Sequence, residues 1–202
     1  MMILRSAPSS PFARKIRIAV AVLGLERDIT IEAADTVDPS DSVRRQNPLG
    51  KIPVLILDDG TAIYDSPVIL EYLDHRAGGG RIVPTAPAAR FAALRQQALC
   101  DGILDAGILR VYEGRWRPPE HHVAKWLDHQ IGKMTRALAS LEAEPPGLDA
   151  PPHVGQITAA CALGYLDFRF EGTWRGDHPR LVAWLDRFAA AVPAFAATRP
   201  NG

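Results

Sequence analysis

The sequence predicts a small α/β domain followed by an all-helical domain. Strand-like and helix-like segments alternate over residues 1–76. A run of glycines and prolines breaks this pattern over residues 77–87, and strand signals nearly vanish over residues 88–202. Alternating strands and helices are typical of a layered α/β domain, whereas a run of helices packs as a bundle. We therefore expect a first domain over 1–76, a linker over 77–87 and a helical domain over 88–202.

Composition limits the classes of partner. The chain has 202 residues, of which 47% are hydrophobic, so it can bury a sizeable core. Lys plus Arg and Asp plus Glu both number 23, which gives a formal net charge of +0, and there is no long basic run. This balance gives no support for binding to nucleic acid or to a membrane surface. No apolar run is long enough to cross a bilayer.

The cysteines and the N-terminus favour a cytoplasmic protein. The two cysteines, Cys100 and Cys161, lie far apart and outside any Cys-x-x-Cys pair. This spacing argues against a disulfide framework, a zinc site or a dithiol redox motif. The six histidines show no metal-ligand spacing, and residues 1–5 lack the layout of a secretory signal. We expect a cytoplasmic protein that needs no metal.

The first helix has clear start and stop signals. Residues 2–5 form a short apolar run that predicts a buried strand, and Ser10 followed by Pro11 then marks a helix start. Gly24 marks its end, because glycine readily adopts the positive φ of a helix C-terminus. The apolar stripe of this helix comprises Phe12, Ile16, Ala19, Val20 and Leu23.

A second strand, a short helix, a hairpin and a further helix complete the first domain. Ile29, Ile31 and Ala33 alternate with polar residues as in a half-buried strand, and the polar segment 35–47 has room for one short helix. Residues 54–57 and 62–64 flank Asp58-Asp59-Gly60, which predicts a β-hairpin. A helix then begins at Ser66-Pro67, and its expected buried stripe comprises Ile69, Leu70, Tyr72 and Leu73.

The sequence of the second half predicts helices throughout. The first spans residues 88–112, where Gly102 and Gly107 either weaken the helix or mark close packing. A mostly apolar helix over 157–170, rich in small residues, is expected at the domain centre. Pro179 precedes another helix, and Pro193 interrupts the tail. The helix between the first and the central one has a stripe of Val123, Leu127, Ile131, Met134, Leu138 and Leu141.

Three segments of the first domain carry a family resemblance. They are Ser9-Ser10-Pro11-Phe12-Ala13-Arg14-Lys15, Asn47-Pro48-Leu49-Gly50-Lys51-Ile52-Pro53-Val54-Leu55, and Tyr64-Asp65-Ser66-Pro67-Val68-Ile69-Leu70-Glu71-Tyr72-Leu73. In this order and spacing they resemble the glutathione-contacting elements of the cytosolic glutathione S-transferases. The resemblance implies a thioredoxin-like first domain and a helical-bundle second domain. Ser10-Pro11-Phe12 is similar to the Cys-Pro-Phe start of the omega-like branch, with serine in place of the reactive cysteine. The resemblance is therefore to a bacterial omega/zeta-like branch with serine at the active-site helix start.

The resemblance gives Ser10 and Ser9 a catalytic role. The thiolate of glutathione is the nucleophile, and a free thiol has a pKa of about 8.5. The N-terminus of a helix offers N–H groups and partial positive charge, and a hydroxyl there can donate to the sulfur. Arg14 and Lys15 add positive charge in the first turns. Either serine could face the sulfur, and the alternative is that Ser10 is only an N-cap.

The same resemblance predicts the glutathione-binding residues. Pro53 would follow a cis peptide bond, and Ile52 would pair its backbone with the cysteinyl part of glutathione. Lys51 would either contact the carboxylates of the tripeptide or remain a solvated lysine. Asp65 would bind the γ-glutamyl ammonium, and Ser66 with its helix start would bind the carboxylate. A plain helix cap is the alternative for Asp65 and Ser66.

Residues of the helical half could complete the site. Phe12, Asp105, Leu109, Tyr112 and Trp116 are the candidates for a second-substrate pocket, with Tyr165 or Trp174 nearby. The alternative is that the aromatic residues are core and the acids are solvated. In some family dimers an acid of the partner's first long helix reaches the γ-glutamyl ammonium, and Asp101 or Asp105 could do so.

The family usually caps its central helix with a Ser/Thr-x-x-Asp box. Here His153-Val154-Gly155-Gln156 stands at that place. Gln156 can still reach back to the start of the helix, but His153 is expected to be a poor cap.

The function that the resemblance implies is attack of a glutathione thiolate on a small electrophile. Glutathione would be a co-substrate, no metal or nucleotide would be needed, and the protein would be a homodimer. One alternative is a non-catalytic regulatory protein on the same fold, similar to the stringent starvation proteins, which act through partner contacts. The other is a glutathione-dependent reductase or peroxidase, which the serine at position 10 disfavours.

Overall fold

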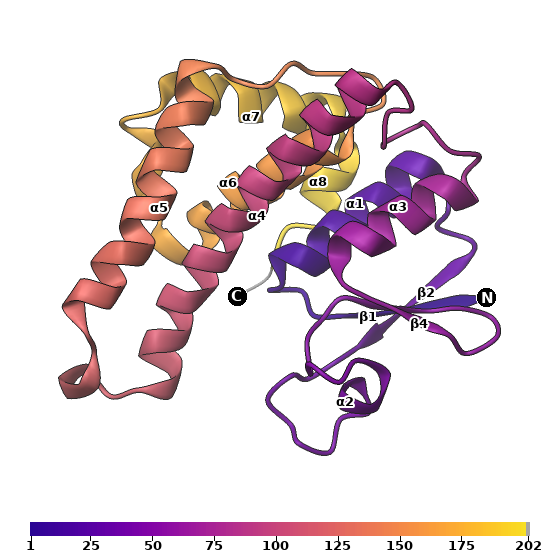
Figure 1. Ribbon diagram of the computed structural model, residues 1–202, viewed down its shortest axis with the longest axis horizontal. Coiled ribbons are helices and arrows are strands. Elements are labelled where there is room, and N and C mark those ends of the chain that lie inside the picture. The colour runs from indigo at the N-terminus through magenta and orange to yellow at the C-terminus, as the bar shows by residue number, and fades with distance from the viewer. Residues whose placement is uncertain (201–202) are drawn as a thin grey trace.

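A computed structural model describes residues 1–200 and shows a mixed four-stranded sheet joined to a helical domain (Figure 1). The strand order is β2-β1-β3-β4; β1 and β2 are parallel and the other pairs are antiparallel. The first half is therefore a thioredoxin-like β/α domain, as predicted. Its strands are β1 (Met2–Ser6), β2 (Ile29–Ala33), β3 (Val54–Ile56) and β4 (Ala62–Ile63).

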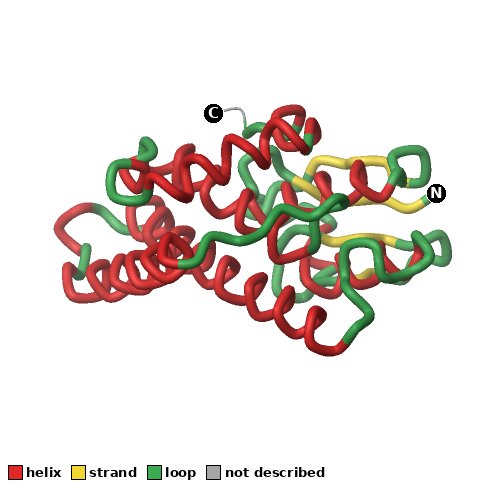
Figure 2. Tube along the Cα trace, turned by 90° about the horizontal axis from the view of Figure 1, so that it is seen from above, coloured by secondary structure: helices red, strands yellow, loops and turns green. Residues whose placement is uncertain are grey.

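The helices fall into two groups. Helices α1 and α3 cover one side of the sheet and α2 lies on the other, while the long helices gather beside this domain (Figures 1 and 2). In the first domain they are α1 (Pro11–Leu23), α2 (Val43–Gln46) and α3 (Ser66–Arg76). In the second they are α4 (Pro87–Trp116), α5 (Ala124–Ala143), α6 (Val154–Phe170), α7 (Pro179–Ala191) and α8 (Pro193–Ala197).

The start and end predicted for α1 are confirmed. The Ser10 hydroxyl accepts a hydrogen bond from the Ala13 N–H at 3.2 Å, and Pro11 occupies the first helical position. Gly24 follows the last turn with φ of 73°, where a side chain would be strained. The N-terminus of α1 is therefore fixed at the place where the site is expected.

The predicted burial of the second strand is wrong in part. Ile29 is buried, but Ile31 is 56% exposed and Ala33 is also exposed. Strand β2 is an outer strand of the sheet that residues 1–200 form and pairs with β1, so its side chains have less to pack against. The predicted hairpin forms between β3 and β4, with Gly60 at φ of 85° in its turn.

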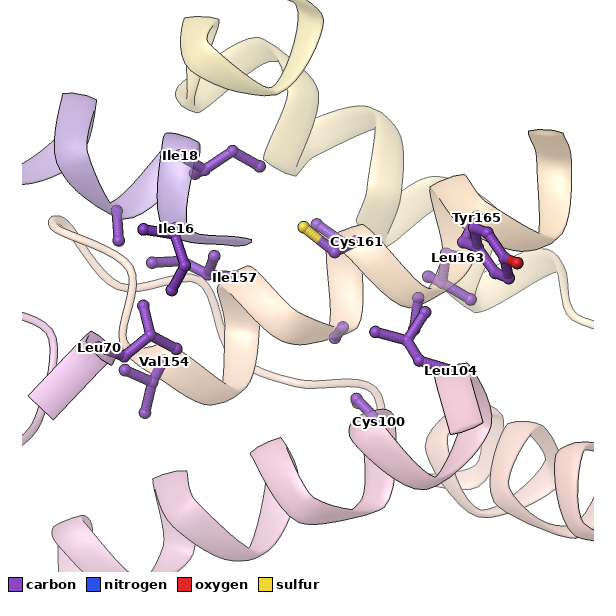
Figure 3. Packing of buried hydrophobic residues seen from close by; sticks show 14 of the residues in the cluster. Ile16, Ile18, Leu70, Cys100, Leu104, Val154, Ile157, Cys161, Leu163 and Tyr165 are labelled. Atoms are coloured by element: carbon purple, nitrogen blue, oxygen red, sulfur yellow. The ribbon is translucent and has the colours of Figure 1, made fainter. Parts of the chain in front are cut away.

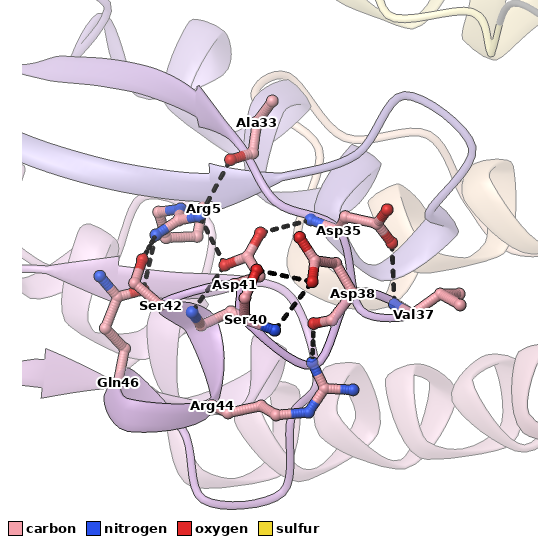
Figure 4. A network of polar contacts seen from close by, with 11 residues as sticks. Arg5, Ala33, Asp35, Val37, Asp38, Ser40, Asp41, Ser42, Arg44 and Gln46 are labelled. Atoms are coloured by element: carbon pink, nitrogen blue, oxygen red, sulfur yellow. Dashed lines mark hydrogen bonds and ion pairs between the residues drawn. The ribbon is translucent and has the colours of Figure 1, made fainter.

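Arg5 anchors the segment that contains α2 to the end of the sheet (Figure 4). Its guanidinium donates to Asp41 Oδ1 at 2.9 Å, to Ser42 Oγ at 2.6 Å and to Gln46 Oε1 at 2.9 Å. It also donates to the Ala33 carbonyl at 3.0 Å, so one buried arginine ties β2 to α2. This network holds the chain that leads directly into the expected glutathione-binding loop.

The segment between α3 and α4 is fixed to both halves. Asp74 accepts from the backbone N–H groups of Gly80, Arg81 and Ile82 at 2.7–2.8 Å. The Ile82 carbonyl accepts from the Val154 N–H, at the start of α6, at 2.8 Å. The side chain of Ile82 is fully buried, so this connection packs as part of the core.

Helix α6 is central, as predicted, and thirteen of its residues are buried. Side chains from α1, α3 and α4 meet it, with Ile16, Leu70 and Leu104 among them, and Cys161 of α6 lies in the same cluster (Figure 3). Gly107 of α4 lies against the Tyr165 ring, which would be 3.3 Å from an added Cβ. Close packing is therefore the reason for Gly107, whereas Gly102 faces open space.

Two predictions for the helical half are corrected. His153 is a good cap, because its Nδ1 accepts from the N–H groups of Gly155 and Gln156 while Gln156 Oε1 accepts from the His153 N–H. In α5, Met134, Leu138 and Leu141 are buried, but Ile131 is exposed. Val123, just before α5, is exposed too, since this end of the α4–α5 pair extends beyond the rest of the domain (Figure 1).

Candidate functional site

A cleft of about 450 Å³ lies between the first domain and α4. Five residues expected to bind glutathione line it together: Lys51, Ile52, Pro53, Asp65 and Ser66. Its other walls include Phe12, Asn47, Leu49, Pro67, Leu94, Gln97, Ala98, Asp101, Gly102 and Asp105. Three segments that are distant in sequence thus share one concave surface.

The loop before β3 presents backbone groups to this cleft. The buried Asn47 side chain donates to the Lys51 carbonyl at 3.0 Å and accepts from the Leu49 N–H at 3.0 Å, which shapes the loop. The Ile52–Pro53 peptide is cis, as expected. Within residues 1–200, the N–H and C=O of Ile52 make no backbone hydrogen bond. Ile52 can therefore pair with an extended peptide, as an added strand does.

The start of α3 combines a carboxylate with helix N–H groups. Asp65 occupies the N-cap position of α3 but makes no side-chain capping bond. Ser66 is buried at the first helical position and lines the cleft with Asp65. Because the Asp65 carboxylate does not cap the helix, it is free to bind a ligand ammonium, while the helix start suits a carboxylate.

Ser9 and Ser10 lie beside the cleft and do not line it. They border a small hollow together with Tyr165, Arg14 and Cys161. The Ser10 hydroxyl acts as an N-cap, yet its own hydrogen remains able to donate.

The start of α1 is electropositive. Burial raises the pKa of the Cys161 thiol to about 11, but Arg14, Lys15 and Arg17 all act in the opposite direction. The Cys161 thiol, which lies next to the serines, is thus in the positive field of these side chains. Positive charge of this kind favours a thiolate held nearby, and Asp101 acts against it at this thiol.

A buried ion pair, which sequence spacing does not predict, joins α1 to α4 beneath the cleft. Lys15 Nζ lies 2.6 Å from Asp101 Oδ1, and the lysine side chain has no exposed surface. Burial raises the pKa of Asp101, although Lys15 opposes this shift. One turn earlier, Gln97 is buried in the cleft wall and its Nε2 has no hydrogen-bond partner. Lys15 and Asp101 lie too far apart in the sequence for their spacing to predict the ion pair.

The candidates for a second-substrate pocket separate into two groups. Phe12 and Asp105 line the cleft, whereas Leu109, Tyr112 and Trp116 continue along α4 beyond it. Trp116 is 62% exposed, near the end of α4. Trp174 is buried core, and its indole N–H donates to Asp167. Tyr165 lies beside Ser9 and Ser10, and the spacing of these residues in the sequence does not reveal this proximity.

Residues 1–200 contain no group of three or more His, Cys, Asp or Glu side chains placed to hold a metal ion. Over the same residues, none of the helices has the length and apolar character needed to cross a membrane.

Comparison with known proteins identifies the family. The family model described as "Glutathione S-transferase, N-terminal domain" matches residues 9–76. The family model described as "Glutathione S-transferase, C-terminal domain" matches residues 124–187. The uncharacterized GST-like protein YibF of Escherichia coli (strain K12) is 33% identical over 95% of both chains. The chain belongs to the glutathione S-transferase family.

Solved structures of other family members extend this result. A glutathione transferase family member from Pseudomonas fluorescens Pf-5, with bound glutathione, is 41% identical over 100% of both chains, with a TM-score of 0.92. A second structure of a glutathione transferase family member from that strain, also 41% identical over 100% of both chains, has bound S-(propanoic acid)-glutathione and a TM-score of 0.87. A glutathione S-transferase from Methylobacillus flagellatus KT, with glutathione bound, is 33% identical over 100% of both chains, with a TM-score of 0.91.

Proposed function

We propose that this glutathione S-transferase family member binds glutathione in the cleft and stabilises its thiolate for attack on a small electrophile. The observation that carries the proposal is the shared cleft wall formed by Ile52, Asp65 and Ser66. Free backbone groups at Ile52 suit the cysteinyl peptide, and Asp65 with the start of α3 suits the γ-glutamyl zwitterion. Similar proteins that are 41% and 33% identical were solved with glutathione bound, which supports this ligand.

Ser10 or Ser9 would hold the sulfur at the start of α1. The capping role of Ser10 leaves a hydroxyl hydrogen for the thiolate, and Ser9 borders the same hollow. The helix N-terminus and the field of Arg14, Lys15 and Arg17 favour the anion at this point. A serine start does not provide a protein thiol, so the chemistry is expected to be transfer and not disulfide exchange. On the basis of this serine-proline start, we propose that the chain belongs to the omega/zeta-like branch.

The second substrate would meet the sulfur where α4 and α6 face the serines. The structure with bound S-(propanoic acid)-glutathione supports a small substituent on the sulfur in this group of proteins. For the present chain, we infer that the substituent passes from Ser9 and Ser10 toward Tyr112 and Tyr165.

The proposal includes a homodimer. Val68 on α3 is 51% exposed and Phe91 on α4 is 69% exposed. The Arg90–Glu71 ion pair, at 2.8 Å, joins these two helices beside them. A second copy of the chain covering this apolar surface would bury both side chains.

Calorimetric titration with glutathione, followed by rates with a panel of electrophiles, tests the proposal. Binding with turnover supports the transferase. Binding without turnover of any electrophile would favour the regulatory alternative, and absence of binding would overturn the proposal.

A further inference from the structure

A second cavity, of about 330 Å³, lies among α1, α6, α7 and α8. Helix α8 packs against α1 there (Figure 1). Among residues 1–200, none that lines this cavity also lines the glutathione cleft. Pockets that bind small organic molecules begin at about 300 Å³, so the cavity has room for one. The proposed function does not use it.

Arg14 of α1 forms one wall of this cavity and is only 4% exposed. Its Nη2 donates to the Phe195 carbonyl at 2.6 Å and its Nε to Thr198 Oγ1 at 3.3 Å, while the guanidinium lies 4.1 Å from the centre of the Phe195 ring. Its Nη1 makes no hydrogen bond within residues 1–200. An added Cβ at Gly164, also in the cavity wall, would be 2.6 Å from Nη1. A buried arginine thus keeps an unused donor beside the cavity.

Arg199 brings a second guanidinium to the same cavity. Within residues 1–200, neither Arg14 nor Arg199 forms an ion pair. Burial lowers the pKa of Arg14 most, and Arg17 and Arg199 lower it further, whereas Cys161 and Asp167 raise it. The Arg14 and Arg199 side chains therefore lie close enough to repel each other. A carboxylate bound to both would offset this repulsion, and its planar shape matches a guanidinium.

The remaining lining residues indicate how much charge a ligand should carry. Arg175 pairs with Asp167 at 2.6 Å, and Asp186 is the other acid of the wall. Three arginines and two aspartates therefore line the cavity, a surplus of one positive charge. Phe168 and Phe195 supply aromatic surface beside these charges. A ligand with one negative charge and a flat apolar body matches both features.

We propose that this cavity binds a small aromatic monocarboxylate. Arg14 and Arg199 hold its carboxylate, and its ring packs against Phe168 and Phe195. The ligand binds together with glutathione, because the cavity and the cleft have separate walls. This inference goes beyond the proposed function and does not depend on it.

Binding of 2-naphthoate tests the proposal, with 2-naphthamide as a neutral ligand of the same shape. Calorimetry is carried out on wild type, Arg199→Gln, Asp186→Asn and the control Arg187→Gln, with and without excess glutathione. Arg199 is exposed, so its substitution should leave the fold intact, and thermal unfolding verifies this for each variant. Arg187 is an exposed arginine of α7 that does not line the cavity.

We expect wild type to bind 2-naphthoate about tenfold more tightly than 2-naphthamide, as for a charge-assisted hydrogen bond. In Arg199→Gln this ratio should fall toward one. In Asp186→Asn it should rise, because a carboxylate that repels the ligand is removed. Arg187→Gln should leave the ratio unchanged, and glutathione should not change the affinity for 2-naphthoate.

Equal affinity of wild type for the acid and the amide, or failure of both to bind, would overturn the inference. A ratio that Arg199→Gln leaves unchanged would also overturn it. Displacement of 2-naphthoate by glutathione would place the acid in the cleft and overturn it too. Absence of glutathione binding would overturn the proposed function alone, because 2-naphthoate binding is measured without glutathione as well.

Discussion

Lys15 of α1 and Asp101 of α4 form an ion pair of 2.6 Å across the boundary between the two domains. The lysine side chain is fully buried, while the aspartate side chain keeps 16% of its surface on the cleft wall. The pair thus connects the helix that begins at the serines to the helix that forms the opposite wall. Removing one partner of a buried pair leaves an uncompensated charge.

Asp101→Asn is therefore expected to lower the free energy of unfolding by about 3 kcal/mol, because it leaves the Lys15 ammonium buried without its counter-charge. Asp105→Asn, one turn away on the same cleft wall, should change stability by less than about 0.5 kcal/mol. Urea unfolding of the two variants beside wild type makes the comparison. Equal stability of Asp101→Asn and wild type would contradict the importance of this pair.

Asp65→Asn is expected to weaken glutathione binding by about 1.5–3 kcal/mol, since it removes the charge from a contact with the γ-glutamyl ammonium. Glu71→Gln is a matched control, because Glu71 lies on the same helix and pairs with Arg90 at the surface. Calorimetry should show a ten- to hundredfold rise in Kd for Asp65→Asn and no change for Glu71→Gln. If both variants bind like wild type, Asp65 does not contact the ligand.

The cap of α6 should make stability depend on pH. Burial lowers the pKa of His153 below its ordinary value of 6.5, and the exposed Asp149 opposes this only in part. The unfolded chain then takes up the proton more readily than the folded chain, because a protonated Nδ1 cannot accept from Gly155 and Gln156. The stabilisation is complete above about pH 6.5 and is lost as the pH falls below it.

His153→Ser keeps an N-cap acceptor that does not titrate. We expect wild type to lose about 1 kcal/mol more than this variant between pH 7.5 and pH 5.5, because the other histidines are common to both. Urea unfolding at the two pH values measures the difference. A constant difference between wild type and variant would show that the cap does not depend on the protonation of His153.

The two cysteines should be unreactive in the folded protein. Cys100 and Cys161 are fully buried, and burial raises the pKa of both thiols, that of Cys161 to about 11. Iodoacetamide at pH 8 should label neither in native protein and both after denaturation, as mass spectrometry would show. Rapid labelling of native protein would reopen the reductase alternative, which needs an accessible thiol.

Much of the fold follows from local patterns. The start of α1 at Ser10 and Pro11, the hairpin around Gly60 and the apolar helix α6 each depend on neighbouring residues, so the sequence predicts them well. Ile31 was less predictable: alternation predicts a strand, but only the sheet order shows that this strand is at an edge.

The site is predictable where the segments carry motifs and obscure where contacts join distant helices. Ile52 and Asp65 share the cleft, as their motifs imply. Lys15 looks like a surface charge in the sequence, since its partner Asp101 lies 86 residues away. The position of Tyr165 beside the serines likewise depends on how α6 crosses α1.

Stabilisation of the bound thiolate is the central claim. Thiolate absorbance of glutathione bound to wild type, Ser9→Ala and Ser10→Ala, followed against pH, tests it most directly. We predict an apparent pKa below the value of about 8.5 for a free thiol in wild type. One serine variant should raise that pKa, with little change in glutathione affinity, and so identify the serine that contacts the sulfur. If glutathione bound to wild type titrates at the pKa of the free tripeptide, the protein does not stabilise the thiolate.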